Sequence, residues 1–484
     1  MPIITEVDLL KHRRTKIIAT LGPASDQPEI IHGLINAGVN VVRLNMSHGD
    51  HTSHAATFAR VREAAQALKQ PIAILADLCG PKIRTGAFEH GQMELATGSK
   101  VIVTTRDIIG SPGIIPSQYD ALATDVQPST SILLDDGRLK LQVISVAGTE
   151  ISCSVVDGGT LKNHTGINLP NTDLSAPSLT TKDRDDVEFA LNLGVDFLAL
   201  SFVRRASDIE ELRALVEHAT RSPALIAKIE NPEALEHASD IIAATDAIMV
   251  ARGDLGVELN PEQVPLAQRQ LIDMSRAANK PVIVATQMLE SMIENPRPTR
   301  AEVTDVSAAV SMGADAIMLS GETAAGAYPI QAVTMMDRIA RQSESYFLQH
   351  SGSTSRRTRG APDSPVPFGD AIADAAARLV YDLQARAVLV ISRTGMSAVT
   401  VSAARPPAPV VGITGDADTC RRMNLMWGLI PVVADDVRHA NANEIARRTA
   451  RDLGLAADGQ RLLLVRGFSS APQYNTPSIT ILNM

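Results

Sequence analysis

The chain has 484 residues, of which 45% are hydrophobic, 20% charged and only 3% aromatic. This length exceeds what a single core fills and predicts about three domains. The formal net charge of −9 and the lack of a long basic tract argue against a nucleic-acid partner, and no apolar run is long enough to span a membrane. We therefore expect a cytoplasmic protein whose scattered cysteines, Cys79, Cys153 and Cys420, are free and mostly buried thiols.

Between Thr15 and Phe347, short apolar runs alternate with helical segments. The apolar runs predict eight strands, TKIIATLG, NVVRLNM, IAILADL, FLALSF, ALIAKIE, AIMVARG, PVIVATQ and AIMLSG. The other segments predict helices, PEIIHGLINAG, residues 55–69, KDRDDVEFALNLG, ASDIEELRALVEHA, PEALEHA, PEQVPLAQRQLIDMSRAANK, RAEVTDVSAAVSMG and IQAVTMMDRIARQSESYF. Eight such repeats are the number that closes a (β/α)8 TIM barrel.

One long interruption follows the third predicted strand. Residues 80–177 contain short alternating runs, KVIVTT, SILLDD, LKLQVISV and EISCSVV, between clusters of Gly, Pro, Asp and Ser. This pattern predicts an inserted all-β domain of hairpins, placed to act as a lid near the catalytic face. The barrel domain is then expected in two parts, residues 1–79 and 178–350.

A change of composition marks the end of the barrel. Residues 351–367 are rich in Ser, Arg, Gly and Pro without apolar periodicity, which predicts a linker. Residues 368–484 then alternate helices, among them FGDAIADAAARLVYDL, with the strands AVLVIS, PVVGIT, PVVAD and RLLLVRG. We expect a separate C-terminal α/β domain, which keeps the whole chain in the α/β class.

Charged residues and glycines lie together in the segment AIMVARGDLGVE. An apolar strand runs here into Arg252, Gly253, Asp254 and Gly256. Strands this apolar are buried on both faces, and the carboxyl ends of such parallel strands are where α/β sheets bind ligands. The segment therefore predicts one edge of an active site.

Two other predicted strands carry polar residues on one face. Side chains alternate along a strand, so Arg43, Asn45 and Ser47 of NVVRLNMSHG point the same way. Lys228 and Glu230 of ALIAKIEN share a face in the same manner. Polar positions at a barrel mouth favour a functional role over the alternative, an ordinary solvated strand end.

Glu230 and Asp254 are the predicted metal ligands. They lie at neighbouring strand ends, and two carboxylates with open positions suit Mg²⁺, which keeps waters and takes substrate oxygens as further ligands. Lys228 and Arg43 beside such an ion are what phosphoryl transfer requires, because negative charge spreads over the oxygens of the transferring group. The alternative is a salt bridge that only caps the barrel.

Hydroxyl groups follow the last two predicted strands of the barrel. Thr286 lies in VIVATQMLESM, and Ser320 lies near Glu322 in IMLSGET. Taken singly, each hydroxyl fits the N-cap of a helix. Together they could conduct a proton.

At these residues the chain resembles the pyruvate kinase family. The motifs RRTKIIATLGPAS, NVVRLNMSHG, DLCGPKIRTG, LLDDGR, AKIEN, MVARGDLGVE, ATQMLESMIENPRPTRAE and DAIMLSGETAAGAYP occur in the family's order along nearly all of the chain. The resemblance implies transfer of the phosphoryl group of phosphoenolpyruvate to ADP, giving pyruvate and ATP, with Mg²⁺ or Mn²⁺ as the cofactor. It also implies a barrel with a β-rich lid, a C-terminal regulatory domain and a homotetramer.

The resemblance assigns roles to the residues at the barrel mouth. Arg43 and Lys228 contact the phosphoryl group, and Lys228 stabilises the transition state of its transfer. Glu230 and Asp254 hold the metal ion. The backbone amides of Gly253 and Asp254 receive the substrate carboxylate, as amides at a helix start readily do.

By the same resemblance, Thr286 contacts the substrate and lies with Ser320 where the enolate takes its proton. The nucleotide contacts fall on four further residues, Thr20, Pro23, His48 and Arg84. Arg84 lies where the lid begins, so that lid closure brings a guanidinium to the phosphates and excludes water. Taken alone, His48 is more simply an ordinary loop histidine.

The chain departs from the family pattern after Asp77. Potassium-dependent members have a Thr-Lys pair there and a Glu after the proline, where this chain has Leu78, Cys79 and Lys82. We expect the Lys82 ammonium to replace K⁺, so that activity requires no K⁺. The oxygen donors around that position would come from Asn45, Ser47, Asp77 and the carbonyl of Leu78.

Two binding regions leave alternatives open. Thr165 replaces a lysine with which the family contacts ATP, and either Lys162 or His164 could take that contact. In the C-terminal domain, SRTGMSA resembles the family's phosphate-binding effector loop, with donors from Ser392, Thr394, Gly395 and Ser397. The expected effector is a sugar phosphate or AMP, and the alternative is a plain strand-to-helix turn with an N-cap.

Two other classes of function compete with phosphoryl transfer. A Mg²⁺-dependent lyase or aldolase acting on pyruvate enolate would need neither Arg84 nor a lid nor a nucleotide. A non-catalytic metabolite sensor would have lost Lys228, Glu230 or Asp254, and the chain retains all three. The kinase is therefore the leading hypothesis.

Overall fold

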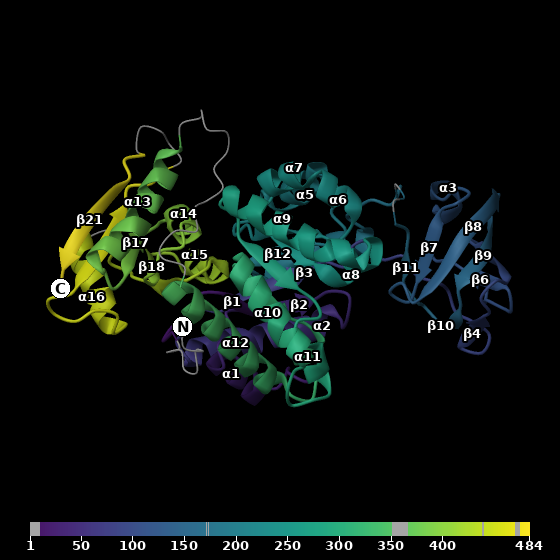
Figure 1. The fold of residues 1–484 in the computed structure, drawn as a ribbon, viewed down its shortest axis with the longest axis horizontal. Helices are drawn as coiled ribbons and strands as arrows, with labels where there is room; N and C mark the ends of the chain where they lie inside the picture. The colour runs from purple at the N-terminus through teal and green to yellow at the C-terminus, as the bar shows by residue number, and fades with distance from the viewer. Residues whose placement is uncertain (1–9, 171, 173, 351–365, 438–439, 470–474) are drawn as a thin grey trace.

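The computed structural model describes residues 10–170, 172, 174–350, 366–437, 440–469 and 475–484. Three parts follow one another along the long axis of the molecule (Figure 1): a C-terminal α/β domain, a central barrel and a β-rich region. The predicted fold class is thereby confirmed. Most of the predicted linker, residues 351–365, lies outside the described residues.

The central part is a closed parallel barrel with the strand order β1-β16-β15-β14-β13-β12-β3-β2. Its members are the eight predicted strands, β1 (Lys16–Thr20), β2 (Val41–Asn45), β3 (Ala73–Asp77), β12 (Phe197–Leu200), β13 (Ala224–Ile229), β14 (Ala247–Ala251), β15 (Val282–Ala285) and β16 (Ala316–Leu319). Alternate residues face opposite sides: Val41 belongs to the core inside the barrel, whereas Val42 and Leu44 pack toward the helices. Arg43 shares the inward face with Val41 and lies nearer the carboxyl end.

Helices surround the barrel, as the apolar periodicity predicts. They are α1 (Pro28–Asn36), α2 (His51–Ala67), α4 (Thr181–Leu193), α5 (Ala206–Val216), α6 (Pro232–Glu236), α7 (Ala238–Ala244), α8 (Arg252–Glu258), α9 (Val264–Ala277), α10 (Arg300–Met312), α11 (Gly321–Ala324) and α12 (Pro329–His350). Short 3₁₀ helices, η1 (Pro261–Gln263) and η2 (Glu290–Ile293), join some of them. Three short helices, α7, α8 and α11, were not predicted; each spans at most about two turns.

The β-rich region, hereafter the β domain, leaves the barrel after β3 and returns before α4. It contains a six-stranded sheet of order β11-β7-β8-β9-β5-β6 and a two-stranded sheet, β10-β4. Its elements are β4 (Gln92–Leu95), β5 (Lys100–Thr104), β6 (Ile114–Pro116), α3 (Leu122–Asp125), β7 (Ser131–Leu134), β8 (Leu139–Ala147), β9 (Glu150–Asp157), β10 (Gly159–Lys162) and β11 (Ile167–Asn168). The four predicted runs are β5, β7, β8 and β9, and a separate apolar cluster forms the core of this domain.

The C-terminal domain is a five-stranded sheet of order β19-β18-β17-β20-β21 with helices packed on it. Its elements are α13 (Phe368–Leu383), β17 (Val388–Ile391), α14 (Met396–Ala403), β18 (Val410–Thr414), α15 (Ala417–Arg422), η3 (Met423–Leu425), β19 (Leu429–Val433), α16 (Ala442–Asp452), β20 (Arg461–Arg466) and β21 (Ser478–Asn483). The antiparallel edge strand β21 was not predicted. Along the sheet, the chain order reverses between β17 and β20, which is where such sheets bind ligands.

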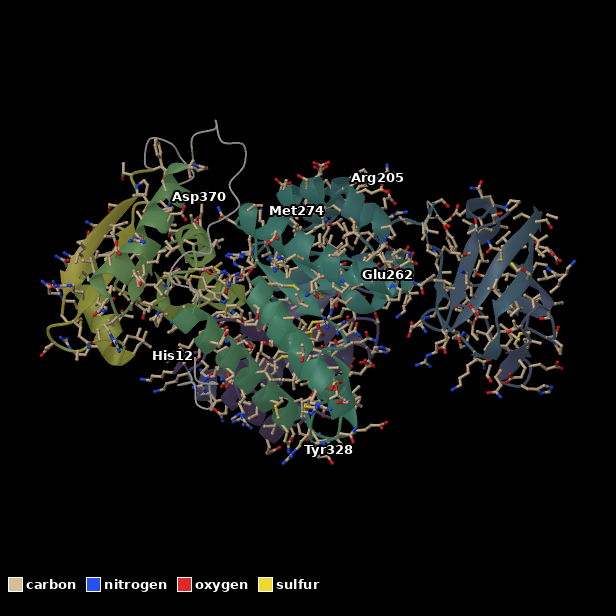
Figure 2. All side chains as sticks on the ribbon, in the orientation of Figure 1. His12, Arg205, Glu262, Met274, Tyr328 and Asp370 are labelled. Atoms are coloured by element: carbon tan, nitrogen blue, oxygen red, sulfur yellow. The ribbon has the colours of Figure 1, made fainter. Side chains whose placement is uncertain are left out.

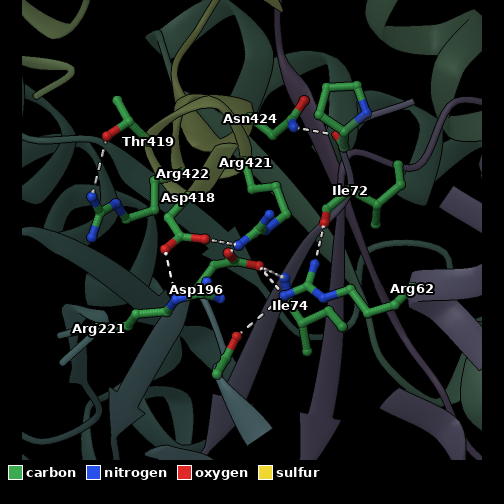
Figure 3. A network of polar contacts seen from close by, with 12 residues as sticks. Arg62, Ile72, Ile74, Asp196, Arg221, Asp418, Thr419, Arg421, Arg422 and Asn424 are labelled. Carbon is green, nitrogen blue, oxygen red and sulfur yellow. Dashed lines mark hydrogen bonds and ion pairs between the residues drawn. The ribbon is translucent and has the colours of Figure 1, made fainter. Parts of the chain in front are cut away.

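A buried carboxylate joins the barrel to the C-terminal domain (Figure 3). Asp196, just before β12, accepts hydrogen bonds from Arg62 of α2 at 2.8 Å and from Arg421 of α15 at 2.7 Å. Its Oδ2 atom also accepts the amide of Ile74 in β3 at 2.8 Å. A buried charge needs such partners to repay its lost hydration, so the junction fixes α15 against the start of two barrel strands.

Candidate active site

Polar side chains from neighbouring strands meet at the carboxyl end of the barrel. Arg43 lies in β2, Asp77 ends β3, Ser201 follows β12, and Lys228 lies near the end of β13. The strands β2, β3, β12 and β13 are adjacent in the barrel, so their carboxyl ends lie side by side. The barrel therefore brings together residues that are up to about 185 positions apart in sequence, as closed parallel barrels do.

Lys228 lies at the centre of this cluster and is 9% exposed. Its Nζ atom is 3.0 Å from Glu230 Oε1 and 3.3 Å from Asp77 Oδ1, and it donates a hydrogen bond to Ser201 Oγ at 2.6 Å. Burial lowers the pKa of Lys228, but Asp77 and Glu230 outweigh burial and hold the pKa above its ordinary value. The side chain is therefore a fixed cation at neutral pH.

Asp77 joins the two cations of the site. Arg43 Nε donates to Asp77 Oδ2 at 2.6 Å, whereas Lys228 is paired with Asp77 Oδ1. Burial raises the pKa of Asp77, yet Lys228 and Arg43 together lower it below its ordinary value. From the family resemblance, Asp77 is expected only near a monovalent cation, whereas in the structure it contacts and orients both Lys228 and Arg43.

Glu230 and Asp254, the predicted metal ligands, are close enough for their charges to interact. Burial raises the pKa of Glu230; Lys228 lowers it and Asp254 raises it further. Glu230 Oε2 accepts the amide of Phe202 at 2.6 Å, while Asp254 lies in the first turn of α8 rather than on a strand. The described residues hold no cluster of three or more metal-binding side chains. Two neighbouring carboxylates fit a divalent ion that keeps waters and substrate oxygens as its other ligands.

Thr286 follows β15 in a strained conformation. Its φ of +67° is rare for a β-branched residue, and such strain gathers at functional sites. Arg252 holds this turn, because its Nη2 atom donates to the Thr286 carbonyl at 2.7 Å and its Nη1 atom bonds Asp305. The amide of Gly253 donates to Thr286 Oγ1 at 2.7 Å, so the predicted carboxylate-binding amide and the predicted substrate contact adjoin each other.

Ser320 begins α11 but does not cap it with its side chain. Its amide donates to Glu322 Oε2 at 2.7 Å, and the amide of Leu289 donates to Glu322 Oε1 at 3.0 Å. Burial raises the pKa of Glu322, which is 2% exposed. The helix-cap alternative therefore does not account for either hydroxyl, since Thr286 begins no helix.

The four predicted nucleotide residues lie around β1, β2 and the start of the β domain. The Thr20 hydroxyl accepts a bond from Arg43 at 3.1 Å and donates to the Leu319 carbonyl at 2.9 Å, while Pro23 and His48 are exposed. Burial lowers the pKa of His48, and the charges of Lys82, Arg84 and Arg43 lower it further. The charges of those cations therefore reach His48 in the loop after β2.

Three of the four oxygen donors expected around a monovalent cation, Asn45, Asp77 and the Leu78 carbonyl, already have hydrogen bonds. The Leu78 carbonyl accepts Ser201 Oγ at 2.7 Å, and Asn45 Oδ1 accepts the amide of Ser47 at 3.2 Å. Lys82 is exposed, and among the described residues no hydrogen bond or ion pair links it to these donors. Lys82 instead lines a cavity between the barrel and the β domain.

This cavity has a volume of about 390 Å³. Its lining includes Lys82, Phe202, Arg204, Arg205, Asp254 and Glu258. Arg205 lies on the side of the barrel that faces the β domain (Figure 2). Asn168 Nδ2 of β11 donates to Glu258 Oε1 of α8 at 3.1 Å, so the β domain is hydrogen-bonded to the helix that carries Asp254.

The remaining predicted residues lie in loops. Arg84 donates to the carbonyl of His164 at 3.1 Å, and Thr165 Oγ1 donates to the carbonyl of Lys162 at 2.8 Å, which keeps this group together in the β domain. Lys162 and His164 both expose their side chains.

The predicted effector loop directly follows β17. Gly395 has a φ of +88° at the start of α14, and Ser392 and Ser397 are buried while Thr394 is exposed. The loop lies at the carboxyl end of a central strand, beside the reversal of chain order in the sheet. Both the effector interpretation and the plain-turn alternative fit this geometry.

Comparison with known proteins relates the barrel with its inserted β domain, and also the C-terminal domain, to one family. The model of the pyruvate kinase barrel domain matches residues 12–333, and the model of the pyruvate kinase alpha/beta domain matches residues 370–482. A pyruvate kinase of Agrobacterium vitis is 42% identical over 477 residues, which covers 98% of this chain and 97% of the relative. One of Geobacillus stearothermophilus is 43% identical over 463 residues, covering 94% of this chain and 78% of the relative.

Solved structures show the same relation. A crystal structure of a pyruvate kinase from Cryptosporidium parvum matches with a TM-score of 0.89 and 36% sequence identity, covering 98% of this chain and 97% of that one.

The three cysteines are free, and no helix within the described ranges is both long and apolar enough to cross a membrane.

The contact between the β domain and α8 predicts a pH-dependent stability. Burial raises the pKa of Glu258 from 4.5 to about 7, so the folded state holds its proton more tightly than the unfolded state. This contribution is fully present below about pH 4.5 and is lost as the pH rises through about 7. Relative to Glu258→Gln, the free energy of unfolding of the unmodified chain should fall by ~1 to 3 kcal/mol across this range.

Denaturant titrations at several pH values measure this difference. Glu262→Gln is the control, because Glu262 is an exposed carboxylate on the same side of the barrel (Figure 2). A constant difference between the unmodified chain and Glu258→Gln at every pH would show that Glu258 does not titrate in this way.

Proposed function

This chain belongs to the pyruvate kinase family of phosphotransferases, and we propose that it transfers the phosphoryl group of phosphoenolpyruvate to ADP, forming pyruvate and ATP. The observation that carries the proposal is the Lys228 ammonium, held between Asp77 and Glu230 beside the Arg43 guanidinium. Two fixed cations at the mouth of a barrel suit a dianionic phosphoryl group whose charge spreads during transfer. A lyase acting on the enolate would need neither Arg84 nor a lid nor a nucleotide.

Arg43 and Lys228 orient the transferring group. Asp77 holds both side chains, so neither has to be ordered when the substrate arrives. The ammonium of Lys228 stays protonated because its neighbours are carboxylates, and it therefore stabilises negative charge without giving up a proton. Preorganised charge of this kind costs no reorganisation during the reaction.

Glu230 and Asp254 would hold Mg²⁺ or Mn²⁺. When bound, such an ion neutralises phosphoryl oxygens and aligns donor and acceptor. Glu230 is fixed for this role by the amide of Phe202, which donates to its Oε2 atom. Asp254 lies in the first turn of a helix that follows β14 directly, which keeps its carboxylate at the barrel mouth.

The enolate side of the substrate is assigned to the two turns that follow β14 and β15. The amides of Gly253 and Asp254 bind the carboxylate, as backbone donors at a helix start do. The Thr286 hydroxyl, now bonded to the Gly253 amide, contacts the substrate. Thr286 and Ser320 lie at the ends of adjacent strands, β15 and β16, from which a proton can reach the enolate carbon through their hydroxyls or a relayed water.

We assign nucleotide binding to Thr20, Pro23, His48 and Arg84 and the lid to residues 80–177. In support, the charges of Lys82 and Arg84 already lower the pKa of His48, so the start of the β domain reaches the loop after β2. Closing this domain over the barrel would bring Arg84 to the phosphates and exclude water. Whether Lys162 or His164 replaces the lysine absent at Thr165 is part of the same assignment.

Regulation is assigned to the C-terminal domain. The loop with Ser392, Thr394, Gly395 and Ser397 would bind a sugar phosphate or AMP, in support of which it lies at the ligand-binding edge of its sheet. Asp196 and Arg421 then connect this domain to the barrel. By analogy with the family we also propose a homotetramer that works in the cytoplasm.

Lys228→Met tests the central assignment. Removing the ammonium should lower kcat at least ~10³-fold, because a cation aimed at the transferring group is worth that much in phosphoryl transfer. A coupled assay of pyruvate formation measures the loss, and Mn²⁺ binding followed by electron paramagnetic resonance should survive, since Glu230 and Asp254 are unchanged. Lys100→Met in β5, an exposed position, is the control. An active Lys228→Met variant would refute the role of Lys228.

Lys82→Glu tests the proposed independence of K⁺. The unmodified chain should turn over at the same rate with KCl or with a tetramethylammonium salt of equal ionic strength. In the variant, a carboxylate takes the place of the ammonium, so turnover should require added K⁺. Indifference of the variant to K⁺, or a requirement for K⁺ in the unmodified chain, would contradict the replacement.

A further inference from the structure

The two connections between the barrel and the β domain meet at one buried carboxylate. Asp183 lies in the first turn of α4, where the chain has just returned from the β domain, and it is 0% exposed. Its Oδ1 atom accepts the amide of Gly80, on the outgoing connection, at 3.1 Å. Its Oδ2 atom accepts the amide of Thr180 at 2.9 Å and the Thr180 hydroxyl at 2.6 Å, on the returning connection.

Gly80 is held closely against the active site. Its φ is +68°, and a Cβ atom there would lie 2.9 Å from the Phe202 ring and 3.1 Å from Ser201 Cβ. Only glycine combines this backbone conformation with this contact at little cost. The outgoing connection therefore packs directly on the two residues that follow β12.

Those two residues hold the catalytic side chains. Ser201 Oγ accepts a hydrogen bond from Lys228 and donates one to the Leu78 carbonyl, two residues before Gly80. The amide of Phe202 fixes Glu230. A shift of Gly80 would therefore move the Leu78 carbonyl and the Ser201 hydroxyl that orients Lys228.

The returning connection has a second tie to the same region. Arg204, which follows Phe202 closely, donates hydrogen bonds to the carbonyls of Leu174 and Ala176. Both connections are thus anchored beside the end of β12, and Asp183 is the one group among the described residues that bonds to both. An inserted domain that closes over a site needs such a fixed pivot. If either connection slid, the closed domain would take a different position over the barrel.

We propose that Asp183 is a positioning residue for the reaction. It fixes the pivot of the β domain and, through Gly80 and the Leu78–Ser201 hydrogen bond, the direction of the Lys228 ammonium. It touches no reacting atom. The inference rests on the proposed function only in that the readout is phosphoryl transfer; the tie itself is a property of the fold.

The competing account is that Asp183 merely caps α4. Thr180 and Asp183 do form a capping box. Thr299 and Glu302 form the same box at α10, where Glu302 also accepts an amide from outside the helix, that of Ser291 at 2.7 Å. Ser291 belongs to η2 of the barrel and not to the β domain. Glu302→Gln is therefore a matched control that removes equivalent chemistry without touching the pivot.

Asp183→Asn is the test variant. The amide keeps the volume, and its oxygen stays with the two donors of Thr180, which turns its NH₂ group toward the Gly80 amide, another donor. We expect kcat to fall about 10- to 100-fold, the size of effect seen when a supporting residue misplaces the reacting groups. Hydrogen exchange of the connecting segments, residues 78–86 and 174–180, should accelerate. Glu302→Gln should retain kcat and the exchange rates of these segments.

Each outcome decides the matter. A wild-type kcat and unchanged exchange in Asp183→Asn, or an equal loss of kcat in Glu302→Gln, would overturn the proposal. If the unmodified chain itself forms no pyruvate, the proposed function fails, and the exchange rates alone then decide whether Asp183 fixes the pivot.

A second pair of variants tests the same tie from the other side. Gly80→Ala places a Cβ against Phe202, whereas Gly194→Ala at the end of α4 imposes similar backbone strain, at a φ of +75°, with nothing within 4 Å. Gly80→Ala alone should lower kcat and speed exchange of the two connections. Equal behaviour of the two variants would overturn the proposal, and this pair applies also if Asp183→Asn does not fold.

Discussion

A buried ammonium that must stay charged is the constraint on which the site depends. Lys228 can remain ionised at 9% exposure only because carboxylates from β3 and from the end of β13 lie within 3.3 Å of it. Those carboxylates meet it only because β3, β12 and β13 are in register, with Ala199 opposite Asp77. Closure of the barrel, burial of the charge and orientation of Arg43 are therefore parts of one arrangement.

The same arrangement explains how the inserted domain can serve the site without supplying its central charges. The central cations Lys228 and Arg43 and the proposed metal ligands come from the barrel, whereas the β domain contributes a cavity wall, the Asn168–Glu258 hydrogen bond and the cations Lys82 and Arg84. On the opposite side, Asp196 fixes α15 against the starts of β3 and β12, whose far ends carry Asp77 and Ser201. The C-terminal domain thus adjoins strands that end at the site, and the β domain contacts the helix that carries Asp254.

The sequence predicted the barrel strands well because each is a short apolar run that ends in polar residues. The short helix α8 was missed, because it follows an apolar strand directly and contains two glycines, so its sequence has no visible helical period. Arg43, Lys228 and Glu230 could be found from strand alternation, which is a local signal. The central role of Asp77 depends on strand neighbours distant in sequence, and Ser201 and Phe202 carry no motif, although Ser201 stands at the end of its strand as the other site residues do. Arg252, conspicuous in the sequence, instead supports the Thr286 turn.

The most direct test is to measure ATP and pyruvate together when the unmodified chain is incubated with Mg²⁺, phosphoenolpyruvate and ADP. If two fixed cations and two metal-binding carboxylates serve phosphoryl transfer, the two products form in equal amounts. Because the neighbours of Lys228 raise its pKa, no loss of ATP formation should trace to that lysine as the pH rises through neutrality. Pyruvate without matching ATP, or no turnover of phosphoenolpyruvate, would contradict the account.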